Sequence, residues 1–184
     1  DERMPDWSPD GQSIVYEIGD GVNNGEIRVL NITTNRSSML ATGRAPVWSP
    51  DGKYVAYMQK QPSGYWQIYV QNVRDNTTWS LKHNNEHCRF PAWSPDGVWI
   101  AYNTYVFSSA PRGQTYDIWR MQADGSGSPQ RLTTNGDSGR PTWSADGKRI
   151  VYNHGEYLYL LDVNGKTSIR LNHTDNGWAP DWAW

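Results

Sequence analysis

The chain is short of cysteine, of long apolar stretches and of excess charge. Its 184 residues include one cysteine, Cys88, so no disulfide can form within the chain. A run of about 18 apolar residues is missing, which excludes a transmembrane helix. The 17 Lys and Arg residues are balanced by 19 Asp and Glu residues, so there is no basic excess of the kind typical of nucleic-acid binding. We therefore expect no transmembrane segment and no nucleic-acid partner.

Motifs for catalysis and for cofactor binding are also missing. The sequence has no Gly-x-Ser-x-Gly, no His-Glu-x-x-His and no glycine-rich phosphate loop between a strand and a helix. The histidines are scattered along the chain, at His83, His87, His154 and His173. The sequence therefore predicts no catalytic residue, no metal site and no cofactor.

Tryptophan and tyrosine are abundant, whereas phenylalanine is rare. The chain has 11 Trp and 11 Tyr residues but only 2 Phe. Aromatic side chains with a polar tip suit half-buried strand positions, where one edge packs and the other meets water or a hydrogen-bond partner. The 17 Gly and 11 Pro residues indicate frequent turns. This composition predicts an all-β protein.

One heptapeptide recurs along the chain and sets its organisation. The pattern Pro-x-Trp-Ser-Pro-Asp-Gly occupies 5–11, 46–52, 91–97 and, with Ala145 in place of the second proline, 141–147. A broken copy without Ser-Pro-Asp-Gly occupies 180–184. The copies lie about 40–50 residues apart, which is the spacing of β-propeller blades.

Every copy predicts the same set of strands. The Trp lies on a first strand, Ser-Pro-Asp-Gly forms a tight turn, and a β-branched residue alternates with a tyrosine on a second strand. These alternating pairs are Ile14 and Tyr16, Val55 and Tyr57, Ile100 and Tyr102, and Ile150 and Tyr152. Third strands are predicted at 26–29, 67–70, 117–121 and 157–160, and fourth strands ending at 39–40, 79–81, 131–133 and 169–171. Such four-stranded antiparallel repeats, with no helix, indicate a β-propeller.

The chain is interpreted as a single propeller domain of four blades plus the first strand of a fifth. We place the blades at about 1–43, 44–88, 89–138 and 139–177 and the extra strand at 178–184. Three ring arrangements stay open: a piece of a larger propeller, a tight four-bladed ring with the fifth strand outside it, or a ring completed by self-association of two chains.

The repeated residues are interpreted as structural, because every blade has the same need for a turn and for packing. Trp48, Trp93 and Trp143 are expected to pack between blades, and aspartates such as Asp96 to cap turns. Function is then expected where the copies differ. In a propeller, the loops between strands two and three share one face with the loops that join strand four to the next blade.

The repeats resemble those of TolB-type β-propellers, whose blades carry Pro-x-Trp-Ser-Pro-Asp-Gly-x-x-Ile-x-Tyr/Phe and often end in Arg-Leu-Thr. The third blade matches most fully, with Met-Gln-Ala-Asp-Gly-Ser at 121–126 and Arg-Leu-Thr at 131–133. The resemblance covers essentially the whole chain and implies a six-bladed ring, envelope proteins as partners and a periplasmic or extracellular setting. Members of this family have many functions, so the resemblance is specific for fold and not for activity.

Arginines recur in the connections that lead into the first strands, which are predicted as loops at 41–45, 84–90, 135–140 and 174–178. Arg3, Arg44 and Arg89 lie two residues before the proline, and Arg140 lies one residue before it. Arginines that converge at the channel mouth could hold a carboxylate-bearing tail. The alternative is that they bond to loop carbonyls and neighbouring acidic side chains.

The loops between strands two and three carry aromatic residues. They are longest in the third blade, at 103–116, and the composition is that of a protein-binding hot spot if the rings are exposed. The alternative is that the rings fold back over the blades. The candidate binding residues of this face are Arg44, Tyr65, Trp66, His87, Arg89, Tyr105, Phe107, Arg112, Asp137, Arg140 and Trp178.

We therefore predict a non-catalytic binding module that contacts another protein through its loop-rich face. Two alternatives stay open. Similar blades form the substrate-admitting domain of prolyl-oligopeptidase-like and tricorn-like peptidases, whose catalytic domain lies elsewhere in a longer chain. Glycan recognition, with Tyr and Trp rings stacked on sugars, is the other alternative.

Overall fold

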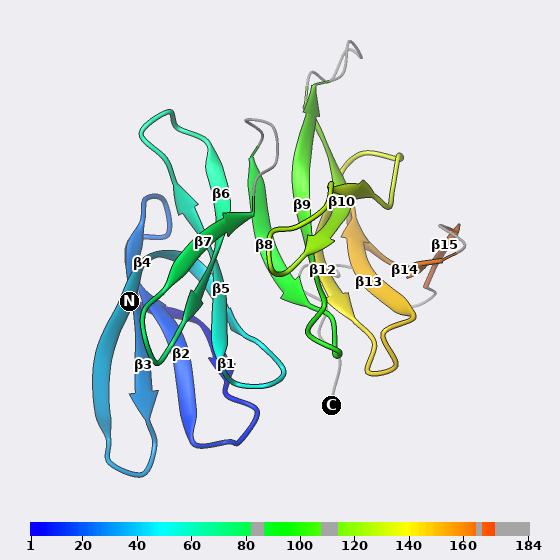
Figure 1. Ribbon diagram of the computed structural model, residues 1–184. Helices are drawn as coiled ribbons and strands as arrows, with labels where there is room; N and C mark the ends of the chain where they lie inside the picture. The colour runs from blue at the N-terminus through cyan, green and yellow to red at the C-terminus, as the bar shows by residue number, and fades with distance from the viewer. Residues whose placement is uncertain (82–86, 108–113, 165–166, 172–184) are drawn as a thin grey trace.

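A computed structural model describes residues 1–81, 87–107, 114–164 and 167–171 of the chain. The regular elements of this described part are all strands, which lie in antiparallel sheets of four blades arranged side by side (Figure 1). The first blade comprises β1 (Glu2–Trp7), β2 (Ser13–Ile18), β3 (Gly25–Asn31) and the beginning of β4 (Arg36–Trp48). The second comprises the end of β4, β5 (Tyr54–Lys60), β6 (Trp66–Asn72) and β7 (Thr78–Leu81).

The third and fourth blades repeat this plan. The third comprises β8 (Cys88–Trp93), β9 (Trp99–Phe107), β10 (Gln114–Gln122) and β11 (Gln130–Arg131). The fourth comprises β12 (Ser138–Trp143), β13 (Arg149–His154), β14 (Tyr157–Asp162) and β15 (Thr167–Arg170). The predicted all-β, four-stranded repeat is confirmed, and the described blades form a partial propeller. The fifth strand expected at 178–184 lies outside the described residues.

The connection between the first two blades is strand and not loop, so the loop predicted at 41–45 is wrong. β4 runs through this segment without a break and pairs with β3 and then with β5, which joins β1 to β7 in one hydrogen-bonded sheet. Gly43 permits this close passage, because a Cβ there would lie 2.7 Å from the carbonyl oxygen of Met58 and 2.7 Å from the ring of Tyr57.

The repeated serine, aspartate and glycine form the turn that the sequence predicts. In the second blade, Ser49 Oγ donates to Asp51 Oδ1 at 2.7 Å and accepts the backbone N–H of Tyr54 at 2.9 Å. Gly52 adopts a φ of +68° and donates its N–H to the Ser49 carbonyl. The same contacts recur in the other three blades, so the repeated aspartates are turn caps.

Of the repeated tryptophans, Trp93 and Trp143 pack between blades as expected, and Trp48 is partly buried against the cluster of the first two blades. The side chains of Trp93 and Trp143 are 8% and 2% exposed, and their indole N–H groups donate to the carbonyls of Val47 and Ala92 at 3.3 and 3.2 Å. Each acceptor lies just before the tryptophan of the preceding blade. Trp7, at the same position of the first blade, is 57% exposed.

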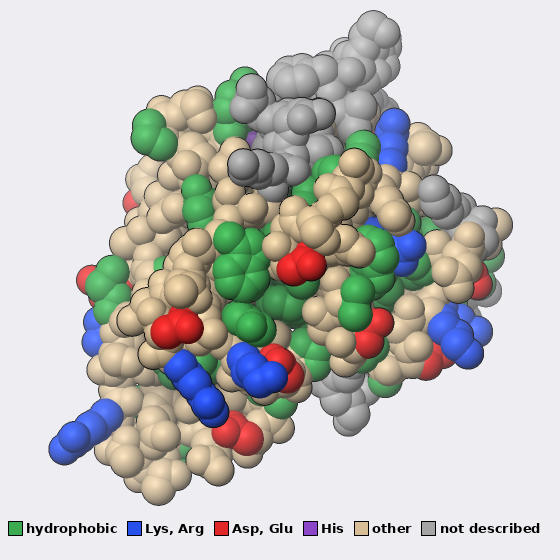
Figure 2. All heavy atoms as spheres, viewed as in Figure 1, with side chains coloured by type: hydrophobic (Ala, Val, Ile, Leu, Met, Phe, Trp, Pro, Cys, Tyr) green, Lys and Arg blue, Asp and Glu red, His purple; other side chains and the backbone are tan. Residues whose placement is uncertain are grey.

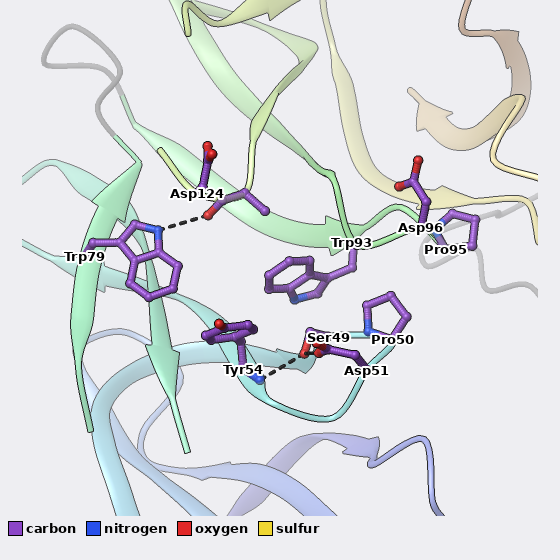
Figure 3. Close-up of a pocket in the computed structure, with 11 residues that line it drawn as sticks. Ser49, Pro50, Asp51, Tyr54, Trp79, Trp93, Pro95, Asp96 and Asp124 are labelled. Carbon is purple, nitrogen blue, oxygen red and sulfur yellow. Dashed lines mark hydrogen bonds between the residues drawn. The ribbon is translucent and has the colours of Figure 1, made fainter. Parts of the chain in front are cut away.

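The core is a series of clusters between neighbouring blades. The cluster between the second and third blades contains Ile68, Val70, Trp93, Ile100 and Tyr102, all nearly or fully buried. Tyr54 and Trp79 pack against its lower edge, where Figure 3 shows them beside Trp93. The core therefore leaves both ends of the blades free to form surfaces.

Candidate functional site

A bend in each innermost strand sets the geometry of the loop-rich face, at the upper end of the blades in Figure 1. The residue before the proline, which is Met4, Ala45, Phe90 or Arg140, has a φ between +45 and +53°. The register of the first two strands shifts at this point in every blade, as in a β-bulge. In the first three blades an arginine directly precedes this residue, whereas in the fourth the residue is itself an arginine, Arg140.

Arg44 is held by an acidic side chain of the first blade. Its Nε lies 3.4 Å from Oε1 of Glu17, a carboxylate that is 1% exposed and also accepts the N–H of Ala45 at 2.7 Å. The guanidinium lies over the Trp66 ring at 5.8 Å. Of the two interpretations offered for the arginines, Arg44 follows the second, because its charge is already paired.

Trp66 is buried, so the expectation that it is an exposed aromatic is wrong. Its side chain is 5% exposed and packs with Ala45 and Met58, with Phe90 against them. Burying the large apolar surface of an indole against these side chains is more favourable in free energy than leaving it exposed to water. Trp66 therefore supports the face from beneath.

The structure brings four of the predicted residues into one aromatic cluster across the second and third blades. The His87 ring lies edge-on to Tyr65, with centroids 5.1 Å apart, and to Tyr105, with centroids 4.7 Å apart. The Arg89 guanidinium lies 5.5 Å from the Tyr105 ring, and Tyr116 packs on the same ring at 4.2 Å. We call Tyr65, His87, Arg89, Tyr105 and Tyr116 the aromatic cluster.

The electrostatics of the aromatic cluster favour neutral rings beside one fixed charge. Desolvation, followed by repulsion from Arg89, lowers the pKa of His87, so the imidazole is neutral at pH 7. Desolvation and a hydrogen bond with Tyr105 raise the pKa of Tyr116. Nδ1 of His87 and Nε of Arg89 are buried and have no hydrogen-bond partner among the residues that the structure describes. A ligand that reaches these two groups would satisfy them.

A cavity of about 210 Å³ lies next to the aromatic cluster, between the third and fourth blades. It is lined by Phe90, Asn103, Tyr116, Asp137, Ser138, Gly139, Arg140 and Asn153. The Arg140 guanidinium covers Phe90 at 4.8 Å. Asn103 is 5% exposed, and its Oδ1 and that of Asn153 are buried without a hydrogen-bond partner in the described part of the chain. These amide oxygens can accept hydrogen bonds from a hydroxyl, amide or amine group.

Sequence reasoning did not single out Asn103 or Asn153 as site residues. It made Asn103 the first residue of the loop at 103–116, and this loop prediction is wrong in part, because 103–107 belong to β9 and 114–116 to β10. Asn103 and Asn153 lie on second strands, one residue after the repeated tyrosine, at a position that holds Glu17 and Met58 in the first two blades. The sequence did contain one signal for these residues, because this position is polar in three of the four copies. Arg112 and Trp178 lie outside the described residues, and the same holds for the side chain of Phe107.

The described residues contain neither a cluster of potential metal ligands nor a helix that could span a membrane. No three His, Cys, Asp or Glu side chains gather there as metal ligands. The same residues contain no helix that is long and apolar enough to cross a membrane.

The repeated turn, the bulged inner strands and the tryptophans between blades define a β-propeller repeat protein. Residues 3–184 match the model of the TolB beta propeller domain, and the chain belongs to this family. No curated protein matches the chain in sequence.

Solved structures agree with this assignment at the level of fold. TolB from Acinetobacter baumannii is 24% identical, with a TM-score of 0.72 over 93% of this chain and 43% of that one. The putative TolB from Agrobacterium tumefaciens is 24% identical, with a TM-score of 0.71 over 89% and 62%. The acylaminoacyl peptidase of Pyrococcus horikoshii is 15% identical, with a TM-score of 0.67 over 92% and 32%. The chain thus spans less than two thirds of each of these proteins.

Proposed function

We propose that the chain is a non-catalytic binding module that holds another protein on its loop-rich face. The observation that carries the proposal is the aromatic cluster, in which Arg89 and three tyrosines lie together beside a cavity. Tyrosine and arginine are enriched at the hot spots of protein interfaces, where a few residues provide most of the binding free energy. The proposal includes a periplasmic or extracellular setting, as the TolB resemblance implies.

The chemistry of the face favours a partner that brings hydrogen-bond donors and an acidic group. Within the described ranges, the amide oxygens of Asn103 and Asn153 lack a donor, whereas Nε of the positively charged Arg89 lacks an acceptor. These groups are already buried in the chain itself, so a partner that reaches and pairs with them would add hydrogen bonds that the described residues do not supply. Arg44 is already paired with Glu17 and contributes packing only.

The test uses the full chain and a partner captured from an envelope extract of its own organism. The affinity of the purified partner is then measured by calorimetry for the parent, Arg89→Ala, Tyr105→Ala and the control Arg74→Ala. Arg74 is exposed in the turn between β6 and β7, at the opposite end of the blades. We expect at least tenfold weaker binding for the first two variants and no change for the control. Equal affinities in all four proteins would contradict the proposal.

A substrate-admitting domain of a peptidase is the second candidate, favoured by the similarity to the acylaminoacyl peptidase. This candidate requires a hydrolase domain in the same polypeptide, which the sequence of the complete gene decides. Carbohydrate is a third candidate, because sugar hydroxyls both donate and accept and would satisfy Asn103 and Asn153. Binding on a glycan array that is lost in Asn103→Ala would favour it.

A further inference from the structure

A second cavity lies at the other end of the blades, away from the face proposed above. It encloses about 410 Å³ between the second and third blades and opens to solvent. The turns before β5 and β9, the outer strand β7 and the turn after β10 form its walls (Figure 3). In Figure 2, apolar side chains gather in the hollow between these two blades, with charged side chains nearby. We call this cavity the lower groove.

Three aromatic rings form the wall of the lower groove. Tyr54 and Trp79 meet edge to face, with centroids 5.5 Å apart and planes inclined by 76°. The indole N–H of Trp79 donates to the Ala123 carbonyl at 2.9 Å, and that of Trp93 donates to Val47. Both indoles are therefore fixed by hydrogen bonds across the blade interface. Aromatic faces carry partial negative charge and attract cations.

Three carboxylates, of Asp51, Asp96 and Asp124, line the same groove. Hydrogen bonds from Ser126 lower the pKa of Asp124, so this carboxylate is ionised at neutral pH. Lys53 pairs with Asp51 at 3.0 Å, but its side chain is 60% exposed and is not part of the lining. The groove thus combines aromatic faces with negative charge, which is the composition that favours an organic cation.

The interface between the third and fourth blades has a cation over the aromatic ring that corresponds to Tyr54. Trp99 is the counterpart of Tyr54, because each donates its backbone N–H to the serine of its own turn at 2.9 Å. The guanidinium of Arg120 lies 4.2 Å from the Trp99 ring. The counterpart of Arg120 in the second blade is Val70, since these residues pair with Ala101 and Ala56 respectively. The chain supplies a cation to Trp99 but none from this position to Tyr54.

We propose that the lower groove binds a lysine or arginine side chain of a partner polypeptide. The cationic head lies among Tyr54, Trp79 and Trp93, and the carboxylate of Asp124 attracts it, whereas Asp96 already interacts with the charge of Arg120. The aliphatic stem covers the apolar wall, as long cationic side chains do elsewhere. This site is independent of the loop-rich face, so either one can be wrong while the other stands.

The probes are the N-acetylated amides of lysine and arginine. The N-acetylated amide of norleucine, whose side chain is uncharged, is the neutral control. Each is titrated into the full chain at low salt, and the indole N–H resonance of Trp79 is followed by NMR. We expect saturable shifts with the two cationic probes, weakened at high salt, and at least tenfold weaker binding of norleucine. Equal binding of norleucine would show an apolar groove and overturn the proposal, and the lack of any shift would overturn it as well.

Two variants distinguish the effect of the Asp124 charge on binding from an effect on folding. Asp124→Asn removes a charge from the lower groove, whereas Asp75→Asn removes one from the neighbouring turn, where Asp75 caps Thr77 outside the groove. We expect Asp124→Asn to weaken the lysine probe at least threefold and Asp75→Asn to leave the affinity unchanged. Equal affinities in both variants would contradict the assignment. The dispersion of the indole resonances reports in the same spectra that both variants are folded.

Discussion

Replacing Trp93 with alanine tests the packing between blades most directly. The side chain is 8% exposed and donates a hydrogen bond to Val47, so truncation removes a ring and leaves a carbonyl without its donor. An indole buries about 150–250 Å², which at about 25 cal/mol per Å² corresponds to roughly 4–6 kcal/mol as an upper bound. Measured large-to-small core changes lie at about 3–5 kcal/mol, and this is the loss of unfolding free energy that we expect.

The chain contains a matched control at the same position of another repeat. Trp7 is 57% exposed, so Trp7→Ala should lower the unfolding free energy by about 1 kcal/mol or less. Urea unfolding followed by circular dichroism measures both variants, provided that the m-value is unchanged. A loss under about 1 kcal/mol for Trp93→Ala, or equal losses for the two variants, would refute the packing argument.

Three further predictions concern other parts of the fold. Gly43→Ala should destabilise the protein by about 1–3 kcal/mol in thermal melts, because the new Cβ would meet the Met58 carbonyl at 2.7 Å; a neutral effect would show that β4 can move away. Arg131→Ala should cost about 1.5–3 kcal/mol in urea unfolding, because it leaves the fully buried carboxylate of Asp117 without its charged partner, and an unchanged midpoint would contradict this. Backbone hydrogen bonds lower the pKa of Asp20 to about 2. Its contribution to stability is therefore complete above the unfolded pKa near 3.8 and is lost as the pH falls towards 2. The melting temperature should fall over this range, and a rise would contradict the prediction.

The strands and turns could be predicted from the sequence because each is specified locally and four times over. Proline, aspartate and glycine define the turn before any long-range contact forms, and the alternation of Ile100 with Tyr102 defines a strand with two faces. The second strands predicted from such alternating pairs agree with the structure, where Ile14 and Tyr16 lie on β2 (Ser13–Ile18). Repetition made these predictions strong, since each copy supports the others.

The site could be predicted only in part, because it depends on contacts between blades. Tyr65, His87, Arg89 and Tyr105 come together as one cluster, but nothing in the local sequence distinguishes them from Trp66, which is buried. Burial is decided by the neighbouring inner strands, which lie far away in sequence. Asn103 was missed for the same reason, since its unpaired amide oxygen is evident only when the next blade closes the cavity.

The uninterrupted strand β4 has a consequence for how the molecule unfolds. It ends the first blade and begins the second, so one hydrogen-bonded ladder runs from β1 to β7. The third and fourth blades form separate sheets. Repeat proteins unfold as coupled neighbouring units, and a shared ladder raises the coupling between the two blades that it joins. Amide hydrogen exchange should therefore show the first two blades opening together as one cooperative unit, with the third and fourth blades opening at their own free energies.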